Sequence, residues 1–245
     1  MSGTTVYVIL VVFVATLIRS ALGFGEALFT VPLLALLLPL RVTVPLAGLL
    51  SITIAGVIVI QDWQKIHLSS TGWLVFATLF GIPLGLLLLT SSHQQIAKVT
   101  LATLLLVFSV YSVFGRKSLE LKTDNLIWLF GCGFFAGVLG GAYGMNGPPL
   151  AIYGAMRRWT PQHFRATLQG YFLPASILGM AGYWFTGLWV PAVTYYYLIS
   201  LPATIPAILL GRLVNHRLRE ETYLKYVYAG LAGIGAALLI QAISK

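Results

Sequence analysis

Two charged residues in apolar surroundings are the side chains of this sequence best placed to do chemistry. Arg19 and Glu26 lie seven positions apart, with Gly23-Phe24-Gly25 between them. The guanidinium could attract an anion, and the carboxylate could carry a proton. Seven positions are too many for a direct pair along a continuous helix, but a break at the glycines could fold the two charges together. Function and mutual neutralisation both stay open, because intramembrane charges are usually paired in either case.

A second run of residues, Gly144 to Pro149, interrupts apolar sequence with two glycines and two prolines around Asn146. Glycine permits tight backbone turns and proline removes N–H donors, so this run predicts a broken helix. The start of a helix after such a break offers N–H groups and a positive dipole end to an anion. Asn146 would add an amide donor and Tyr143 a hydroxyl. The alternative is that these glycines only allow close helix packing and the prolines only kink.

The two interruptions form a pair, because Pro32 follows the first and Pro149 the second, 117 positions later (149 minus 32). Interrupted helices at matching positions of two halves indicate the binding site of a secondary transporter. Gln169 is a further candidate donor to that site, although a hydrogen bond between helices is its alternative role. The predicted substrate-binding set is Arg19, Gly23, Gly25, Glu26, Tyr143, Gly144, Asn146, Gly147 and Gln169.

The composition indicates which elements must position these residues. Of 245 residues, 58% are hydrophobic and 9% are charged, against about 25% charged in an average soluble domain. The fold class predicted is an all-α polytopic membrane protein with eight long helices and two short broken segments. The long segments are expected at 5–22, 42–60, 71–90, 97–115, 125–141, 166–187, 191–211 and 222–243, and the short ones at 26–40 and 146–156.

These segments divide the chain into two repeats, 1–115 and 125–245, joined by a loop at 116–124. Because Lys and Arg favour cytoplasmic loops, their positions test the topology. If the short segments cross and both termini lie outside the inner membrane, eleven basic residues fall inside and three outside; if the short segments dip and return, the count is nine to five. Five crossings per half would make the repeat inverted. The eleven are Lys65, Arg116, Lys117, Lys122, Arg157, Arg158, Arg165, Arg212, Arg217, Arg219 and Lys225, and the three are Arg41, Lys98 and Lys245.

Other chemistries find little support. Cys132 is the single cysteine and cannot form an internal disulfide. The four histidines show no ligand spacing, so no metal or other cofactor is predicted. The net charge of +9 is interpreted as cytoplasmic loops in contact with lipid rather than a nucleic-acid surface. No paired carboxylate, Ser/His or metal-like set lies at membrane depth, and no P-loop is present, so neither an enzyme nor a primary pump is predicted.

The order of these motifs resembles the sulfite exporter TauE/SafE family of membrane permeases. The likeness rests on Gly-Phe-Gly followed by Pro-Leu-Leu in the first half, and on Gly-Gly and Gly-Pro-Pro-Leu in the second. It implies that the family's glycine-rich turns fall on Gly23, Gly25, Gly140, Gly141 and Gly144, and its prolines on Pro32 and Pro149. The sequence departs from the family pattern at Glu26 and Asn146. The resemblance implies transport of small sulfur-containing anions, without a cofactor and coupled to protons.

The function expected is therefore a secondary transporter that moves sulfite or an organosulfonate across the cytoplasmic membrane by alternating access around two broken helices. Its partners would be the small anion, protons as the coupling ion and the lipid bilayer. The alternatives are a carrier of another small anion, such as a carboxylate, and a membrane assembly protein without transport activity. Direction of transport and oligomeric state do not follow from the sequence.

Overall fold

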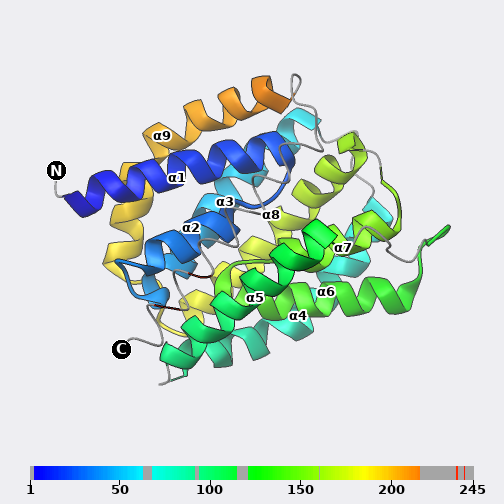
Figure 1. Ribbon diagram of the computed structural model, residues 1–245, viewed down its shortest axis with the longest axis horizontal. Coiled ribbons are helices and arrows are strands. Elements are labelled where there is room, and N and C mark those ends of the chain that lie inside the picture. Colours follow the sequence, from blue (N-terminus) through cyan, green and yellow to red (C-terminus); the bar gives the residue numbers. More distant parts are fainter. Residues whose placement is uncertain are drawn as a thin grey trace.

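The described part of the protein is a bundle of helices (Figure 1). The computed structural model describes residues 3–62, 68–91, 94–114, 121–159, 161–215, 236 and 240. The helices within these residues are α1 (Gly3–Leu22), α2 (Glu26–Ala35), α3 (Leu40–Asp62), α4 (Leu68–Thr90), α5 (Gln94–Phe114), α6 (Leu126–Tyr143), α7 (Gly147–Met156), α8 (Pro161–Phe185) and α9 (Pro191–Asn215).

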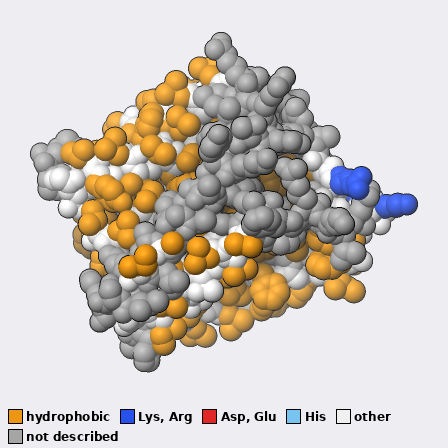
Figure 2. Space-filling view, viewed as in Figure 1, with side chains coloured by type: hydrophobic (Ala, Val, Ile, Leu, Met, Phe, Trp, Pro, Cys, Tyr) orange, Lys and Arg blue, Asp and Glu red, His pale blue; other side chains and the backbone are white. Residues whose placement is uncertain are grey.

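The helix positions agree with the hydropathy of the chain. Seven of the eight long segments predicted are helices here, and α2 and α7 are the two short ones. Within the described residues, five helices, α1, α3, α4, α6 and α9, are long and apolar enough to cross a membrane. The eighth long segment, 222–243, lies outside the described residues except for two positions. Figure 2 shows hydrophobic side chains over the described surface, with Lys and Arg at one end of this view, as a lipid-facing bundle requires.

The first hairpin consists of α1 and α2. The chain turns between them through Gly23 and Gly25, whose φ angles of 89° and 105° favour glycine. α2 then runs back along α1, because the Tyr7 hydroxyl near the start of α1 donates a 2.9 Å hydrogen bond to the Leu33 carbonyl near the end of α2. The short segment therefore runs back toward the end at which its hairpin began.

The second hairpin, α6 and α7, is built in the same way. Gly144 ends α6 with a φ of 67°. The end of α7 returns to the start of α6, where the Leu121 amide donates a 2.9 Å hydrogen bond to the Met156 carbonyl. Ten residues of helix span only about 15 Å, so α2 and α7 each cover about half of a hydrocarbon core of about 30 Å.

The two hairpins open toward opposite ends of the bundle. The first leads directly into the start of α3 at Leu40, and α3 runs the length of the bundle to Asp62. Only five residues separate Asp62 from α4, and Ser70 near the start of α4 contacts Asp124 at the open end of the second hairpin. In Figure 1, α1 accordingly enters from the left and α6 from the right.

The structure corrects the predicted register between the two halves. The amides of Gly23 and Gly144 close their helices by bonding the carbonyls of Arg19 and Gly140, at 2.7 and 2.8 Å. These turns lie 121 positions apart (144 minus 23), and so do the first residues of α2 and α7 (147 minus 26). Matching the prolines gave 117, which is wrong for the helix starts, because Pro32 lies inside α2 whereas α7 begins with its prolines.

Gly140 and Gly141 lie inside α6 rather than in the break, which corrects the family-based expectation. α4 and α6 form the most intimate helix pair of the described residues, because glycines lie on both contact faces. A Cβ atom on Gly81 or Gly85 would overlap the backbone of α6, and one on Gly141 would lie 2.5 Å from the Ile82 carbonyl oxygen of α4. Small residues allow such close approach where lipid provides no hydrophobic driving force between helices.

Asp124 fastens the open end of the second hairpin. Its carboxylate accepts hydrogen bonds from the Ser70 hydroxyl at 2.7 Å and the Tyr153 hydroxyl at 2.8 Å. It also accepts one from Nε of Arg157 at 2.9 Å. Partial burial alone would raise the Asp124 pKa, but the hydrogen bonds from Ser70 and Tyr153 and the positive charge of Arg157 outweigh it, so the pKa is lowered below its usual 3.8.

We expect Asp124→Asn to lower the free energy of unfolding at neutral pH by about 1–3 kcal/mol, because hydrogen bonds to a charged acceptor are lost. A carboxylate with a lowered pKa contributes its full stability above the unfolded value, 3.8, and loses it as the pH falls through the lower folded value. The difference between wild type and variant should therefore shrink toward pH 3. Thermal unfolding of both proteins between pH 7 and pH 3 measures it, and a constant difference would contradict the assignment.

Candidate functional site

A small polar cavity lies between the starts of α2 and α7. Its volume is about 20 Å³, enough for one or two water molecules. Ser51 and Phe172 also line it, and Ser51 stands eleven residues from either end of α3 (51 minus 40, 62 minus 51). Phe172 is one residue from the centre of α8, so the cavity lies at mid-length of two long helices. The lining residues are Arg19, Gly25, Glu26, Ala27, Leu28, Ser51, Gly144, Met145, Asn146, Gly147 and Phe172.

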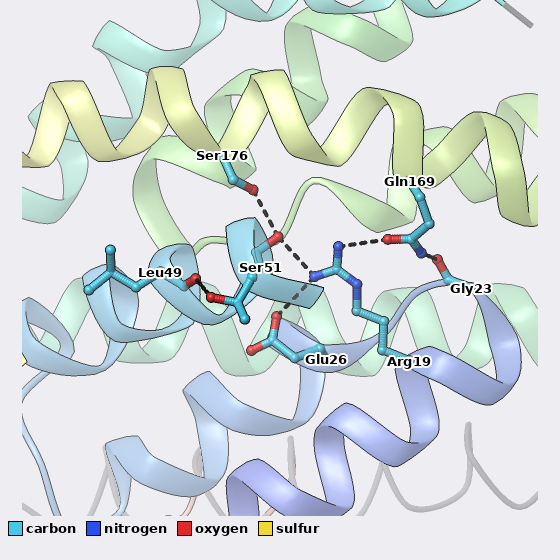
Figure 3. A network of polar contacts seen from close by, with 8 residues as sticks. Arg19, Gly23, Glu26, Leu49, Ser51, Gln169 and Ser176 are labelled. Atoms are coloured by element: carbon cyan, nitrogen blue, oxygen red, sulfur yellow. Dashed lines mark hydrogen bonds and ion pairs between the residues drawn. The ribbon is translucent and has the colours of Figure 1, made fainter. Parts of the chain in front are cut away.

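Arg19 is the cationic centre of this site. Its side chain is only 3% exposed, and its guanidinium points from α1 toward α3 and α8 (Figure 3). Nη1 donates to the Ser51 hydroxyl at 2.8 Å, and Nη2 donates to the Gln169 side-chain oxygen at 2.9 Å. The Phe172 ring covers the guanidinium, with its centroid 4.8 Å from Cζ. Nε has no hydrogen-bond partner among the described residues, so Arg19 retains donor capacity.

Glu26 neutralises Arg19. Its Oε2 lies 3.4 Å from Nη1 of Arg19, and the glutamate is 1% exposed. The pairing that the sequence left open is therefore present, and the turn at Gly23 and Gly25 makes it possible. Glu26 is also the first residue of α2, where the helix dipole favours a negative charge. Its second oxygen, Oε1, has no partner among the described residues.

Gln169 holds the arginine and the break in α1 together. Its side-chain oxygen accepts from Arg19, while its amide nitrogen donates to the Gly23 carbonyl at 2.5 Å. Neither Gln169 nor Gly23 lines the cavity. A Cβ atom on Gly23 would lie 3.1 Å from the backbone of Arg165 on α8, so this glycine also allows α8 to approach the turn. Both predicted residues belong to the support of Arg19 rather than to the cavity wall.

Asn146 brings the second hairpin to the same cavity. Its amide donates to the Tyr171 hydroxyl at 3.4 Å, and Tyr171 shares a 2.6 Å hydrogen bond with Thr78. The N-terminus of α7 is a weaker anion site than the sequence suggested, because its second and third residues are prolines without N–H groups. The start of α2 has no such loss, but Glu26 already places a carboxylate there.

Tyr143 is directed away from the cavity, since its hydroxyl donates to the Ala97 carbonyl at 2.9 Å. Conversely, the sequence did not single out Ser51, Ser176 or Phe172. Ser176 donates to Ser51 at 2.8 Å, so two serines from facing helices extend the polar network around Arg19. In the sequence, Ser51 could be noticed only as a hydroxyl at the centre of an apolar segment. That signal is weak, because many such hydroxyls bond a carbonyl of their own helix, as Thr78 does with Leu74.

Fold and site together define a polytopic helical membrane protein with a buried polar site between two broken helices, the arrangement of secondary transporters. Among the described residues, no three His, Cys, Asp or Glu side chains gather where they could hold a metal ion.

Comparison with known proteins identifies the family. The sequence profile of the family "Sulfite exporter TauE/SafE" matches residues 8–239, and the chain belongs to this family of membrane transporters. It is 27% identical over 183 residues to the "Probable sulfite/organosulfonate exporter TauE" of Cupriavidus necator, which covers 75% of this chain and 70% of that protein. No solved structure matches the chain.

The buried pair can be tested by a double-mutant cycle on stability. Arg19→Met or Glu26→Leu alone leaves one charge buried without its partner, so each should cost about 3–5 kcal/mol of unfolding free energy. The double variant should recover most of that loss, because two apolar side chains need no counter-ion. Equilibrium unfolding in detergent gives the three values, and additive losses would show that the pair is not coupled.

Replacing Gly25 tests the break itself. A Cβ atom there has room, since the nearest atom is 3.8 Å away on Ile18, but a φ of 105° strains any other residue. We expect Gly25→Ala to lower the free energy of unfolding by about 1–3 kcal/mol. Gly179→Ala on α8 is the matched control, because its Cβ meets nothing within 4 Å and its φ is ordinary. Equal effects of the two substitutions would argue against a strained turn.

Proposed function

We propose that this protein is a secondary carrier of a small sulfur-containing oxyanion, sulfite or an organosulfonate, which binds beside Arg19. The observation that carries the proposal is a buried guanidinium with free donor capacity, at mid-length of two long helices, in a cavity between two helix starts. Intramembrane arginines of this kind mark ion pathways. The name of the Cupriavidus necator relative supports a sulfur oxyanion over a carboxylate.

Charge balance makes Glu26 the proton carrier in this proposal. Arg19 and Glu26 are neutral together, and an anion that binds Arg19 would leave a net negative charge in a buried site. An uncompensated buried charge costs several kcal/mol, so the site binds the anion when Glu26 has taken up a proton. Release of that proton lets Glu26 compete again for Arg19 and displaces the anion. Anion and proton then move together without net charge.

The arrangement of the hairpins supports alternating access as the transport mechanism of this proposal. The cavity of about 20 Å³ is too small for an oxyanion, so binding requires one hairpin to move. The hairpins open toward opposite ends, so loosening one of them exposes the cavity to one side at a time. In this proposal the halves 1–115 and 125–245 form an inverted repeat, both termini lie outside, and the protein resides in the cytoplasmic membrane.

Uptake of labelled methanesulfonate into proteoliposomes tests the mechanism, because this anion does not itself titrate near neutral pH. We expect an inward proton gradient of one pH unit to stimulate accumulation by up to about tenfold, since one unit corresponds to about 1.4 kcal/mol. A membrane potential alone should have little effect.

In Glu26→Gln the stimulation by the gradient should vanish and flux should become sensitive to membrane potential, because the site can no longer bind the proton. Arg19→Gln should abolish uptake. Thr103→Ala, an exposed position on α5, serves as the control with wild-type behaviour. Unaltered proton stimulation in Glu26→Gln would remove the proton role, and full uptake in Arg19→Gln would remove the site.

A further inference from the structure

A large apolar groove lies beside the polar cavity. It has a volume of about 500 Å³ and is formed by α5, α6 and α7 together with Leu28 of α2. This volume falls within the range of about 300–1,000 Å³ that small-molecule sites occupy. No charged side chain of the described residues lines it. Its walls suit an alkyl chain and offer nothing to an ion.

Two side chains are shared by this groove and the polar cavity. Leu28 and Met145 line both spaces, and they are 3% and 4% exposed. Each comes from one of the two hairpins, Leu28 from the first turn of α2 and Met145 from the turn that follows α6. Because both residues are on the hairpins, they would move when a hairpin opens. Methionine is unbranched and adapts its shape readily, so Met145 can make room for a chain between the two spaces.

We propose that the groove binds the apolar tail of the transported anion, so that the substrates include alkanesulfonates whose head group lies at Arg19 and whose chain passes between Leu28 and Met145. The inference rests on the proposed function. It commits to a substrate tail because the groove adjoins, across these two side chains, the cavity that Arg19 lines. An acyl chain of a membrane lipid is the competing occupant.

The proposal predicts a dependence of affinity on chain length. Each methylene that leaves water for an apolar site gains a nearly constant increment, so inhibition of methanesulfonate uptake should strengthen two- to fourfold per added carbon. Butanesulfonate and octanesulfonate are the competitors. Alkyltrimethylammonium ions of the same lengths are the controls, because they carry the same tails with the wrong charge for Arg19.

Gly131 allows the groove to be filled without disturbing the packing. It lines the groove, and a Cβ atom there would meet nothing within 4 Å. In Gly131→Phe, the ratio of the inhibition constants of methanesulfonate and octanesulfonate should fall to near one. Gly72→Phe is the matched control, since Gly72 is exposed on α4 and its Cβ also meets nothing; its ratio should equal that of wild type.

Trp128 reports binding independently of transport, because it lines the groove. Bromooctanesulfonate should quench its fluorescence at least several-fold more than the equally long bromooctyltrimethylammonium, with Trp128→Phe as the blank. Equal quenching by both would overturn the proposal and assign the groove to lipid. Uptake of methanesulfonate without any chain-length effect would overturn it too, while the proposed function stands. If methanesulfonate were not taken up at all, the proposed function would be wrong. Quenching of Trp128 fluorescence would still show whether the groove prefers the sulfonate to the ammonium ion.

Discussion

The constraint on which the rest of this structure depends is a positive charge buried at Arg19. A guanidinium with 3% exposure is stable only if its surroundings supply a counter-charge and hydrogen-bond acceptors. Glu26 supplies the charge, and it can reach Arg19 only because the chain turns back between α1 and α2. Ser51 and Gln169 supply acceptors from α3 and α8. The helix break and the polar network therefore depend on each other, because the turn between α1 and α2 brings the counter-charge of Glu26 to Arg19.

Close helix packing holds that arrangement in place. The glycines of α4 and α6 bring two backbones into contact, and α6 in turn carries the second broken segment to the cavity. Lipid cannot drive helices together as water does, so shape and hydrogen bonds must do so. Tyr183 of α8 contributes in both ways: its ring is buried among the helices, and its hydroxyl donates a 2.6 Å hydrogen bond to the Gly140 carbonyl of α6.

Hydropathy and the positions of glycine and proline predict much of the fold, because the length of a membrane span and the place of a helix break are local properties of the chain. The turns at Gly23–Gly25 and Gly144 follow from them, whereas the meeting of Arg19 with Glu26 was only one of the possibilities that the sequence left open. The register of the repeat does not, because Pro32 inside α2 and Pro149 at the start of α7 satisfy different local conditions. Ser51 and the direction of Tyr143 also escape prediction, since only tertiary packing determines which face of an apolar helix meets a neighbour. The family match identifies a membrane transporter, while the substrate, the proton coupling and the inverted repeat stay predictions.

The offset of 121 residues between the hairpins has an evolutionary consequence. With this offset, Gly140 is the counterpart of Arg19 in the second half, and Gly147 is the counterpart of Glu26. The two halves therefore share a backbone turn but not the charges beside it. If the proposed inverted repeat arose by duplication, its two copies have diverged at these two positions. An ancestor assembled from two identical halves would have brought two guanidiniums to one small cavity, or none. Fusion into a single chain permits one arginine, while the side chain of Asn146 fills the space beside Gly140.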